Sequence, residues 1–197
     1  MGRYRTILLV LICLAMVFTA VSCGGNTAPE QAVDSFMRDL QDGDRDRVAD
    51  GLAPGTSMLL LLSADPVAQP GTTALLSFAR SHLTYTLTGG EREGDAATVE
   101  VDVTVPDMTP LLQDYLREAL LLTLVDSSGD LRAALQTLLA EKVDVFSSRE
   151  PFETRTSHVV LSLEKVEDRW KISDAGNLEI AVIVGFEQMF GTSGPVS

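Results

Sequence analysis

The residue with the most distinctive chemistry in this chain is Cys23, because a cysteine thiolate is a nucleophile that can be modified covalently. Cys23 follows an apolar run from Ile7 to Ala20, and Arg3 and Arg5 precede that run without any acidic residue. The run is too short to span a bilayer comfortably and is typical of a cleaved export signal. This order of residues predicts an exported protein that carries its covalent chemistry at Cys23.

The stretch Ala20-Val21-Ser22-Cys23 resembles the bacterial lipobox, in which small residues precede a cysteine that becomes the acylated N-terminus. The resemblance implies cleavage between Ser22 and Cys23 and palmitate or a similar acyl chain on Cys23. We therefore expect a lipoprotein signal peptide at 1–22, an acylated cysteine and short tether at 23–27, one domain at 28–190 and a flexible tail at 191–197. An ordinary signal-peptidase site or an uncleaved anchor would use much the same residues and remains an alternative.

The charge balance limits the partners of the chain. The full sequence has 15 Lys and Arg residues against 28 Asp and Glu residues, a net charge of −13. Removal of residues 1–22 takes away two positive charges and leaves a net charge of about −15. Such a chain lacks the basic face that nucleic acid requires, and charge alone would not hold it on anionic lipid. Because Cys13 lies in the removed part, the mature domain has no intramolecular disulfide and depends on its core for stability.

Helical spacing dominates the first part of the predicted domain. Thr27-Ala28-Pro29-Glu30 matches a capping box with proline in the first turn, and an apolar stripe then predicts a helix to about Gln41. Gly43 is expected to end this helix, and Asp44 to cap a short second one through Val48 and Leu52. The aspartates around Asp44 resemble the opening of a calcium-binding loop, but the rest of that pattern fails, so we interpret them as a solvated turn. A short buried helix or strand at 58–62 and a helix at 73–80 are expected next.

Two hairpins and two further helices complete the pattern. Leu83, Tyr85 and Leu87, then alternating valines from Val99 to Val105, predict an antiparallel hairpin with Gly89-Gly90 before its turn. Thr109-Pro110 predicts the cap and first residue of a helix, and a leucine stripe at 131–139 predicts another. A second hairpin is expected from about 153 to 164 and from 169 to 172, with its turn at 167–168. The segment 178–190 fits either a helix or a strand.

The segment from Leu120 to Val125 is apolar nearly all round. We expect this helix end to be buried on several sides. The alternatives are that it lines a lipophilic cavity or contacts another chain.

The assembled order resembles the cystatin-like, nuclear-transport-factor-like (NTF2-like) α+β domains, in particular those of unknown function carried by bacterial lipoproteins. The resemblance rests on the opening helix Pro29-Glu30-Gln31-Ala32-Val33 with Gly43-Asp44, and on the strand Glu167-Asp168-Arg169-Trp170-Lys171-Ile172. It implies a curved antiparallel sheet packed on N-terminal helices, a cystatin-like cone. The two long helices inserted between the hairpins depart from the smallest members of the family.

The resemblance also implies where a pocket would lie. Enzymatic members place a carboxylate with a tyrosine or histidine in an apolar pocket, so the candidate pocket residues are Tyr85, Asp102, Asp107, Tyr115 and Trp170. No motif joins these residues, and a solvated sheet face explains Asp102 more simply. His82 and His158 have no metal-ligand spacing, so we assign no catalytic residue, no metal site and no cofactor.

Three functions follow from these observations. The first is a non-enzymatic binding or interaction domain, tethered by its lipid to the extracytoplasmic face of the cell membrane, or to the outer membrane in a two-membrane host. Its partner would be another protein or a second copy in a homodimer. The second is a carrier or sensor of a lipophilic small molecule, suggested by the leucines at 59–62 and 120–124. The third is a small acid–base enzyme that uses a pocket carboxylate.

Overall fold

The fold is α+β. A computed structural model describes residues 28–56, 58, 69–125 and 130–182. The elements are α2 (Pro29–Asp42), α3 (Arg45–Asp50), α5 (Pro70–Ser81), β1 (Thr84–Glu93), β2 (Ala96–Pro106), α6 (Thr109–Val125), α7 (Leu131–Ser147), β3 (Thr154–Val166), β4 (Arg169–Asp174) and α8 (Leu178–Val182). The predictions for Ser22 and Cys23, for the segment 59–62 and for the tail 191–197 lie outside the described residues.

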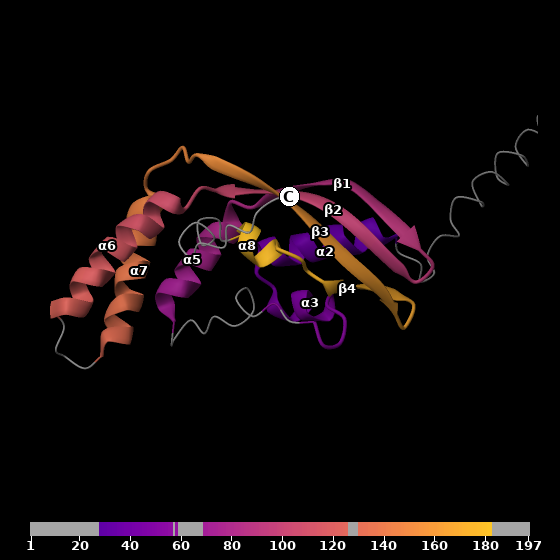
Figure 1. Ribbon diagram of the computed structural model, residues 1–197, viewed down its shortest axis with the longest axis horizontal. Helices are drawn as coiled ribbons and strands as arrows, with labels where there is room; N and C mark the ends of the chain where they lie inside the picture. Colours follow the sequence, from indigo (N-terminus) through magenta and orange to yellow (C-terminus); the bar gives the residue numbers. More distant parts are fainter. Residues whose placement is uncertain (1–27, 57, 59–68, 126–129, 183–197) are drawn as a thin grey trace, which may run out of the picture.

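A curved, open sheet of four antiparallel strands in the order β1-β2-β3-β4 forms the centre of the molecule (Figure 1). Both expected hairpins, β1–β2 and β3–β4, are confirmed. Glu167 and Asp168 form the β3–β4 turn with φ values of 50° and 63°, the left-handed conformation that tight hairpin turns require. The expected α+β class, with a curved antiparallel sheet packed on the N-terminal helices, is therefore confirmed.

One face of the sheet forms the core. The alternating residues that face inward are fully or almost fully buried, whereas their neighbours in sequence face outward. The helix α2 lies against this inner face and contributes its own apolar stripe. The inward residues of the central strands and of α2 are Val99, Val101, Val103, Val105, Val159, Leu161, Leu163, Val33, Phe36, Met37 and Leu40. The valine alternation therefore specifies which face of each strand packs on α2.

The expected helix caps form between α2 and α3 but not at the start of α2. Gly43 ends α2 with a φ of 72°, and the Asp44 side chain accepts a hydrogen bond from the Arg47 backbone N–H at 3.1 Å. The expected capping box at the start of α2 is wrong, because Ala28 occupies the N-cap position and its methyl side chain accepts no hydrogen bond. Pro29 at the first helical position, whose missing N–H needs no partner, is the signal that holds.

The chain after α3 extends the sheet. The Ala53 N–H donates to the Ile172 carbonyl at 2.8 Å, and the Ile172 N–H donates to the Gly51 carbonyl at 2.9 Å. Leu52 thereby forms a parallel bridge with Ile172 at the free edge of β4, instead of continuing α3 as expected. This pairing fixes the end of α3 beside β4.

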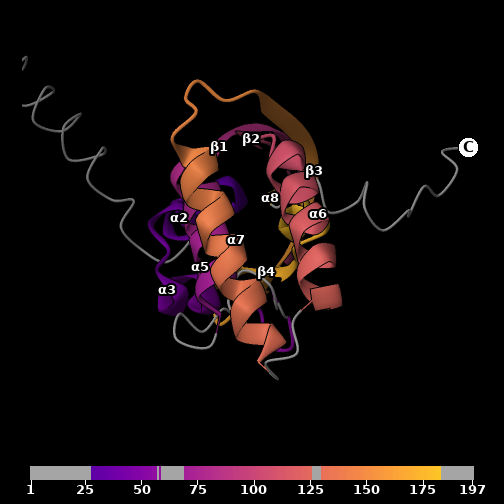
Figure 2. The same cartoon turned by 90° about the vertical axis from the view of Figure 1, so that its left-hand side faces the viewer.

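The two inserted helices, α6 and α7, stand beyond one end of the sheet (Figures 1 and 2). The strands β2 and β3 pair along their length although both helices separate them in sequence. α7 packs closely on α5, where a Cβ atom added to Gly71 would lie 2.3 Å from the Gln136 carbonyl oxygen. α2 begins at the opposite end of the molecule from this helical pair (Figure 1).

Four further expectations need correction or completion. Gly89 and Gly90 precede the turn as expected but lie within β1, next to a bulge between Leu87 and Gly89, and a Cβ on Gly90 would come within 2.6 Å of the Thr98 carbonyl oxygen. Asp107, not Thr109, supplies the acceptor at the start of α6. α5 begins at Pro70, three residues before its expected start. The described part of the last segment, Leu178–Val182, is a helix rather than a strand.

Candidate functional site

Tyr85 lies on the inner face of the sheet, pointing to α2. It pairs with Val103, a buried residue, and its hydroxyl donates a hydrogen bond of 2.7 Å to the Asp34 carboxylate. Burial, with the hydrogen bond to Asp34 next in size, raises the pKa of the Tyr85 hydroxyl. The side chain therefore links β1 to α2 in its neutral form.

Asp102 lies on the other, outer face of the sheet. Its carboxylate is hydrogen-bonded to Nδ1 of His158 at 2.9 Å, and Nε2 of His158 lies 3.9 Å from the Glu100 carboxylate. The Asp102 side chain is 41% exposed, so the pair belongs to a solvated sheet surface rather than to an apolar pocket. No set of three or more His, Cys, Asp or Glu side chains within the described ranges is arranged to hold a metal ion.

Asp107 and Tyr115 lie at the start of α6 and along it. The Asp107 carboxylate accepts hydrogen bonds from the N–H of Thr109 at 3.0 Å and from its hydroxyl at 2.6 Å. Tyr115 is half-buried against the core, and burial raises the pKa of its hydroxyl. No hydrogen bond or ring contact among the described residues joins any two of the five candidate pocket residues. Of the five, only Trp170 lines the groove described next.

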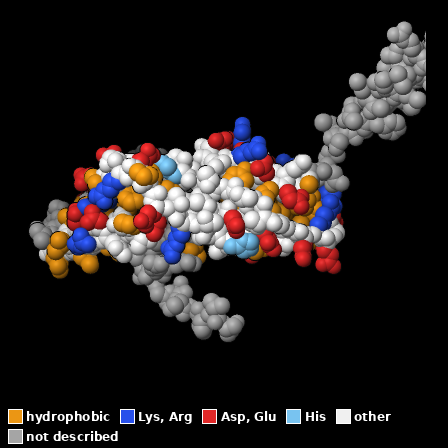
Figure 3. All heavy atoms as spheres, turned by 90° about the horizontal axis from the view of Figure 1, so that it is seen from above, with side chains coloured by type: hydrophobic (Ala, Val, Ile, Leu, Met, Phe, Trp, Pro, Cys, Tyr) orange, Lys and Arg blue, Asp and Glu red, His pale blue; other side chains and the backbone are white. Residues whose placement is uncertain are grey.

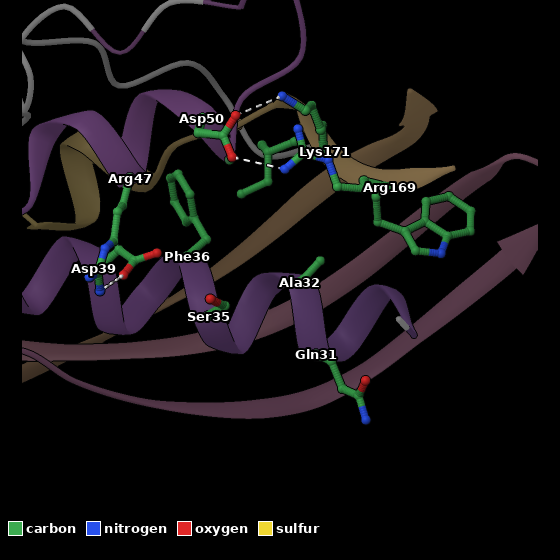
Figure 4. Close-up of a pocket in the computed structure, with 12 residues that line it drawn as sticks. Gln31, Ala32, Ser35, Phe36, Asp39, Arg47, Asp50, Arg169 and Lys171 are labelled. Carbon is green, nitrogen blue, oxygen red and sulfur yellow. Dashed lines mark hydrogen bonds and ion pairs between the residues drawn. The ribbon is translucent and has the colours of Figure 1, made fainter. Parts of the chain in front are cut away.

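A groove of about 440 Å³ lies between α2, α3 and β4 (Figure 4). Its floor is apolar and includes Phe36 and Ile172, which are almost fully buried. Its polar lining comes from two directions, because α2 and α3 supply one side and the edge strand β4 supplies the other. The lining residues are Gln31, Ala32, Ser35, Phe36, Asp39, Arg47, Asp50, Gly51, Arg169, Trp170, Lys171 and Ile172.

Two groups of charged residues border the groove. Asp50, at the end of α3, accepts hydrogen bonds from Arg169 at 3.1 Å and from Lys171 at 3.4 Å (Figure 4). These bonds, the one from Arg169 first, hold the pKa of Asp50 below its usual range. On the other side, Arg47 lies 3.7 Å from Asp39 and 3.2 Å from Asp44. The lining thus presents three cations and two carboxylates above the almost fully buried Phe36 and Ile172, and each cation is paired with a carboxylate.

Trp170 forms a buried part of the groove wall. The residue is 4% exposed, and its ring lies under the Arg92 guanidinium, which is 5.1 Å from the ring centroid. Its Nε1 atom is buried and has no hydrogen-bond partner in the described part of the chain. Trp170 is also the single tryptophan of the sequence, so its fluorescence reports on this groove.

The sequence contains little that would identify the groove in advance. Arg47 and Asp50 are more than 110 residues from Arg169 and Lys171 in the chain, and the Leu52–Ile172 bridge helps to bring them together. The one available signal was Arg169-Trp170-Lys171. Its alternation along a strand predicts that Trp170 points into the core and that the two cations stay at the surface of the strand.

A second surface feature is the outward face of α6. Leu116, Leu120 and Leu124 follow one another at intervals of four residues and are 40%, 66% and 83% exposed, and the adjacent Leu121 is 60% exposed. The expectation that this helix end is buried is therefore wrong, because α6 packs through its other face, which carries Ala119. Hydrophobic side chains gather at this end of the molecule in Figure 3.

The charges beside these leucines neutralise one another. Lys142 of α7 donates to the carboxylate of Asp114 at 2.9 Å and to that of Glu118, and Arg117 lies 3.3 Å from Asp114. Hydrogen bonds to Glu118 and then to Asp114 raise the pKa of Lys142, so it stays charged. These two cations and two carboxylates balance one another, and Glu141 of α7 adds one carboxylate beside Leu121.

A shallow groove of about 580 Å³ lies between α6 and α7, beside Leu121, Leu122 and Leu138.

Along the described part of the chain, none of the helices is both long enough and apolar enough to cross a bilayer.

The comparisons with known proteins give little guidance. No protein-family model matches the chain, and no curated protein matches it. A solved structure that matches is the crystal structure of a "putative lipoprotein (ycdA)" from Bacillus subtilis subsp. subtilis str. 168, with 15% sequence identity and a TM-score of 0.39. The match covers 80% of this chain and 46% of that one, so the chain spans about half the length of this neighbour. A likeness of this size carries no argument about function.

Proposed function

We propose that the protein is a lipoprotein, anchored through Cys23 to the outer face of the cell membrane, and that it acts there as a non-enzymatic interaction domain. The anchor is supported by the order of Arg3 and Arg5, the apolar run and the Ala20-Val21-Ser22-Cys23 stretch. The interaction is supported by one observation above all, the exposed leucines of α6, because soluble domains rarely leave such an apolar surface uncovered without a partner.

The occupant of the leucine face is a second copy of the chain. Leu116, Leu120 and Leu124 form a ridge with a spacing of four residues, and two such ridges interdigitate in the commonest class of helix packing. Two mature chains, each with a net charge of about −15, repel over most of their surfaces, but beside the leucines Lys142 and Arg117 balance Asp114 and Glu118, which reduces the repulsion there. The face also lies at the end of the molecule remote from the start of α2, where neighbouring anchored copies can meet (Figure 1).

The contact is expected to be weak in solution and stronger on a membrane. Burial of a leucine contributes about 1.5–3 kcal/mol, and association costs several kcal/mol in lost freedom, so we expect a dissociation constant of about 10 µM. Anchoring raises the local concentration of the chains and hence the dimer fraction.

Sedimentation velocity tests this proposal. The sample is the chain from residue 23 onward with Cys23→Ser, which retains every described core residue. We expect a monomer–dimer equilibrium that the pair Leu120→Ser and Leu124→Ser abolishes. Val160→Ser is the matched control, because Val160 is also an exposed apolar residue, at 44%, but lies on the sheet. A monomer at all concentrations up to about 200 µM, well above the expected constant, would exclude self-association. A dimer unchanged by the leucine substitutions would exclude this surface.

A second candidate function is the carriage of a lipophilic small molecule in the α6–α7 groove. The observation that favours it is the apolar lining of that groove by Leu121, Leu122, Ala134 and Leu138. Organic extraction and mass spectrometry of the protein purified from its host would recover such a ligand, and Leu138→Ser would reduce its yield. Recovery of no apolar compound above the level of a control protein would count against this candidate.

A further inference from the structure

The groove between α6 and α7 adjoins the leucine face of α6 without a break. Leu121 is 60% exposed, lies one helical turn from Leu124 on the surface of α6, and also lines the groove. The rest of the apolar lining comes from Leu122 of α6 and from Ala134 and Leu138 of α7. The projecting leucines and the hollow of the groove therefore belong to one continuous apolar surface.

A symmetric dimer needs both of these shapes on one surface. In a twofold contact, the same surface of each copy meets the other, so that surface must be complementary to itself. Leu124 is the most exposed leucine of the face, at 83%, and projects from the last turn of α6. On the α7 side of the groove, Ala134 has only a methyl side chain, which leaves room for a larger group. A projecting leucine and a recess that can receive it thus occur at the same end of the molecule.

The polar side chains of the groove do not oppose the insertion of a leucine. The Thr137 hydroxyl donates a hydrogen bond of 3.0 Å to the Ala133 carbonyl of its own helix. The Glu118 carboxylate is held by Lys142, and Glu141 is exposed and can stay in water. Covering the apolar lining therefore takes no hydrogen-bond partner from Thr137 or Glu118.

We propose that, in the dimer, Leu124 of each copy enters the α6–α7 groove of the other copy. This inference rests on the self-association proposed above and extends its interface from α6 to α7. Leu116 and Leu120 then pack between the two α6 helices, whereas the apolar lining of the groove encloses Leu124. The occupant of the groove is thus a second copy of this chain.

A substitution that fills the groove separates this inference from self-association itself. The sample is again the chain from residue 23 onward with Cys23→Ser, studied by sedimentation velocity. Ala134→Phe places a ring in the groove and leaves the leucines of α6 unchanged. We expect it to raise the dissociation constant at least about tenfold, the loss expected when one leucine is no longer buried. Ala49→Phe, the same enlargement at an exposed position of α3, apart from α6 and α7 (Figure 1), should leave the constant within about twofold.

Disulfide cross-linking between two copies tests the contact without a bulky substitution, and it decides the matter if Ala134→Phe fails to fold. Two differently tagged chains carry Leu124→Cys and Thr137→Cys. Each has one thiol, because the sample lacks Cys13 and has serine at residue 23. Thr137 is an exposed residue of the groove lining. We expect mild oxidation of the mixture to join the two tags, and no such product when Thr86→Cys replaces Thr137→Cys.

The outcomes distinguish this inference from the proposed function. A dimer that a folded Ala134→Phe variant leaves unchanged overturns the insertion of Leu124, and so does a chain that dimerises without joining Leu124→Cys to Thr137→Cys. In both cases the leucine face of α6 remains the contact. A parent chain that stays monomeric overturns both proposals. If the groove holds a lipophilic small molecule instead, Ala134→Phe should reduce the amount extracted and leave the dimer unchanged.

Discussion

Asp107 links the end of β2 to the start of α6 through a single side chain. Its carboxylate accepts two hydrogen bonds from Thr109, and its backbone N–H donates to the Glu153 carbonyl at 2.8 Å. Asp107→Ala removes both side-chain bonds at the first turn of α6. We expect the free energy of unfolding to fall by about 1 kcal/mol, as for the loss of a helix cap, measured by urea denaturation.

The pH dependence of this loss has a definite sign. Burial opposes ionisation of Asp107, but the hydrogen bonds from Thr109 outweigh it and hold the pKa of the carboxyl below its usual value. The stabilisation is therefore complete above the unfolded pKa of about 3.9 and is lost as the pH falls through the lower folded pKa. The difference between wild type and Asp107→Ala should shrink below about pH 4. A difference that grows on acidification would contradict the assignment.

At the scale of elements, the contact between α5 and α7 depends on one glycine. A Cβ atom at Gly71 would lie 2.3 Å from the Gln136 carbonyl oxygen and 2.8 Å from the Leu139 Cβ atom, and backbone atoms cannot move as side chains do. Gly71→Ala should therefore lower the free energy of unfolding by about 1–3 kcal/mol, although alanine favours a helix.

Gly89→Ala is the control for this substitution. Its new Cβ would meet only the end of the Glu100 side chain at 3.3 Å, which can turn away. We expect a change within about 0.5 kcal/mol in the same denaturation experiment. Equal stability of both variants would show that α5 and α7 lie further apart than described.

The elements also show which parts of the fold follow from sequence patterns. The strands were predictable because alternating Val99 to Val105 specifies both their extended form and their buried face. The outward leucines of α6 were misjudged, because composition says that a helix is apolar on two sides but not whether a neighbour covers both. The groove could not be predicted, because Asp50 meets Arg169 and Lys171 only through long-range strand pairing.

At the scale of the whole molecule, the α2–α3–β4 groove and the leucine face of α6 lie at different ends. The groove is lined by the start of α2, which follows the proposed anchor residue Cys23, and the leucine face of α6 lies at the far end (Figure 1).

The anchor itself is open to a direct test. Full-length protein labelled with palmitate in a bacterial host should incorporate the label and, after loss of residues 1–22, remain with the membrane fraction. Cys23→Ala should abolish incorporation, because the thiol is the acceptor. Cys13→Ala should have no effect, since Cys13 lies in the removed segment. Labelling that persists in Cys23→Ala would contradict a lipid at this residue.

The central claim, self-association of the anchored protein through α6, is tested most directly by disulfide cross-linking in the membrane. Acylation of Cys23 and removal of Cys13 leave no other thiol in the mature chain, so Leu116→Cys, Leu120→Cys and Leu124→Cys each introduce one reporter. Thr86→Cys, on the exposed outer face of β1, is the control. We expect mild oxidation to give a disulfide-linked dimer for at least one α6 position and only monomer for Thr86→Cys. Monomer at all four positions, or equal cross-linking at all of them, would contradict the account.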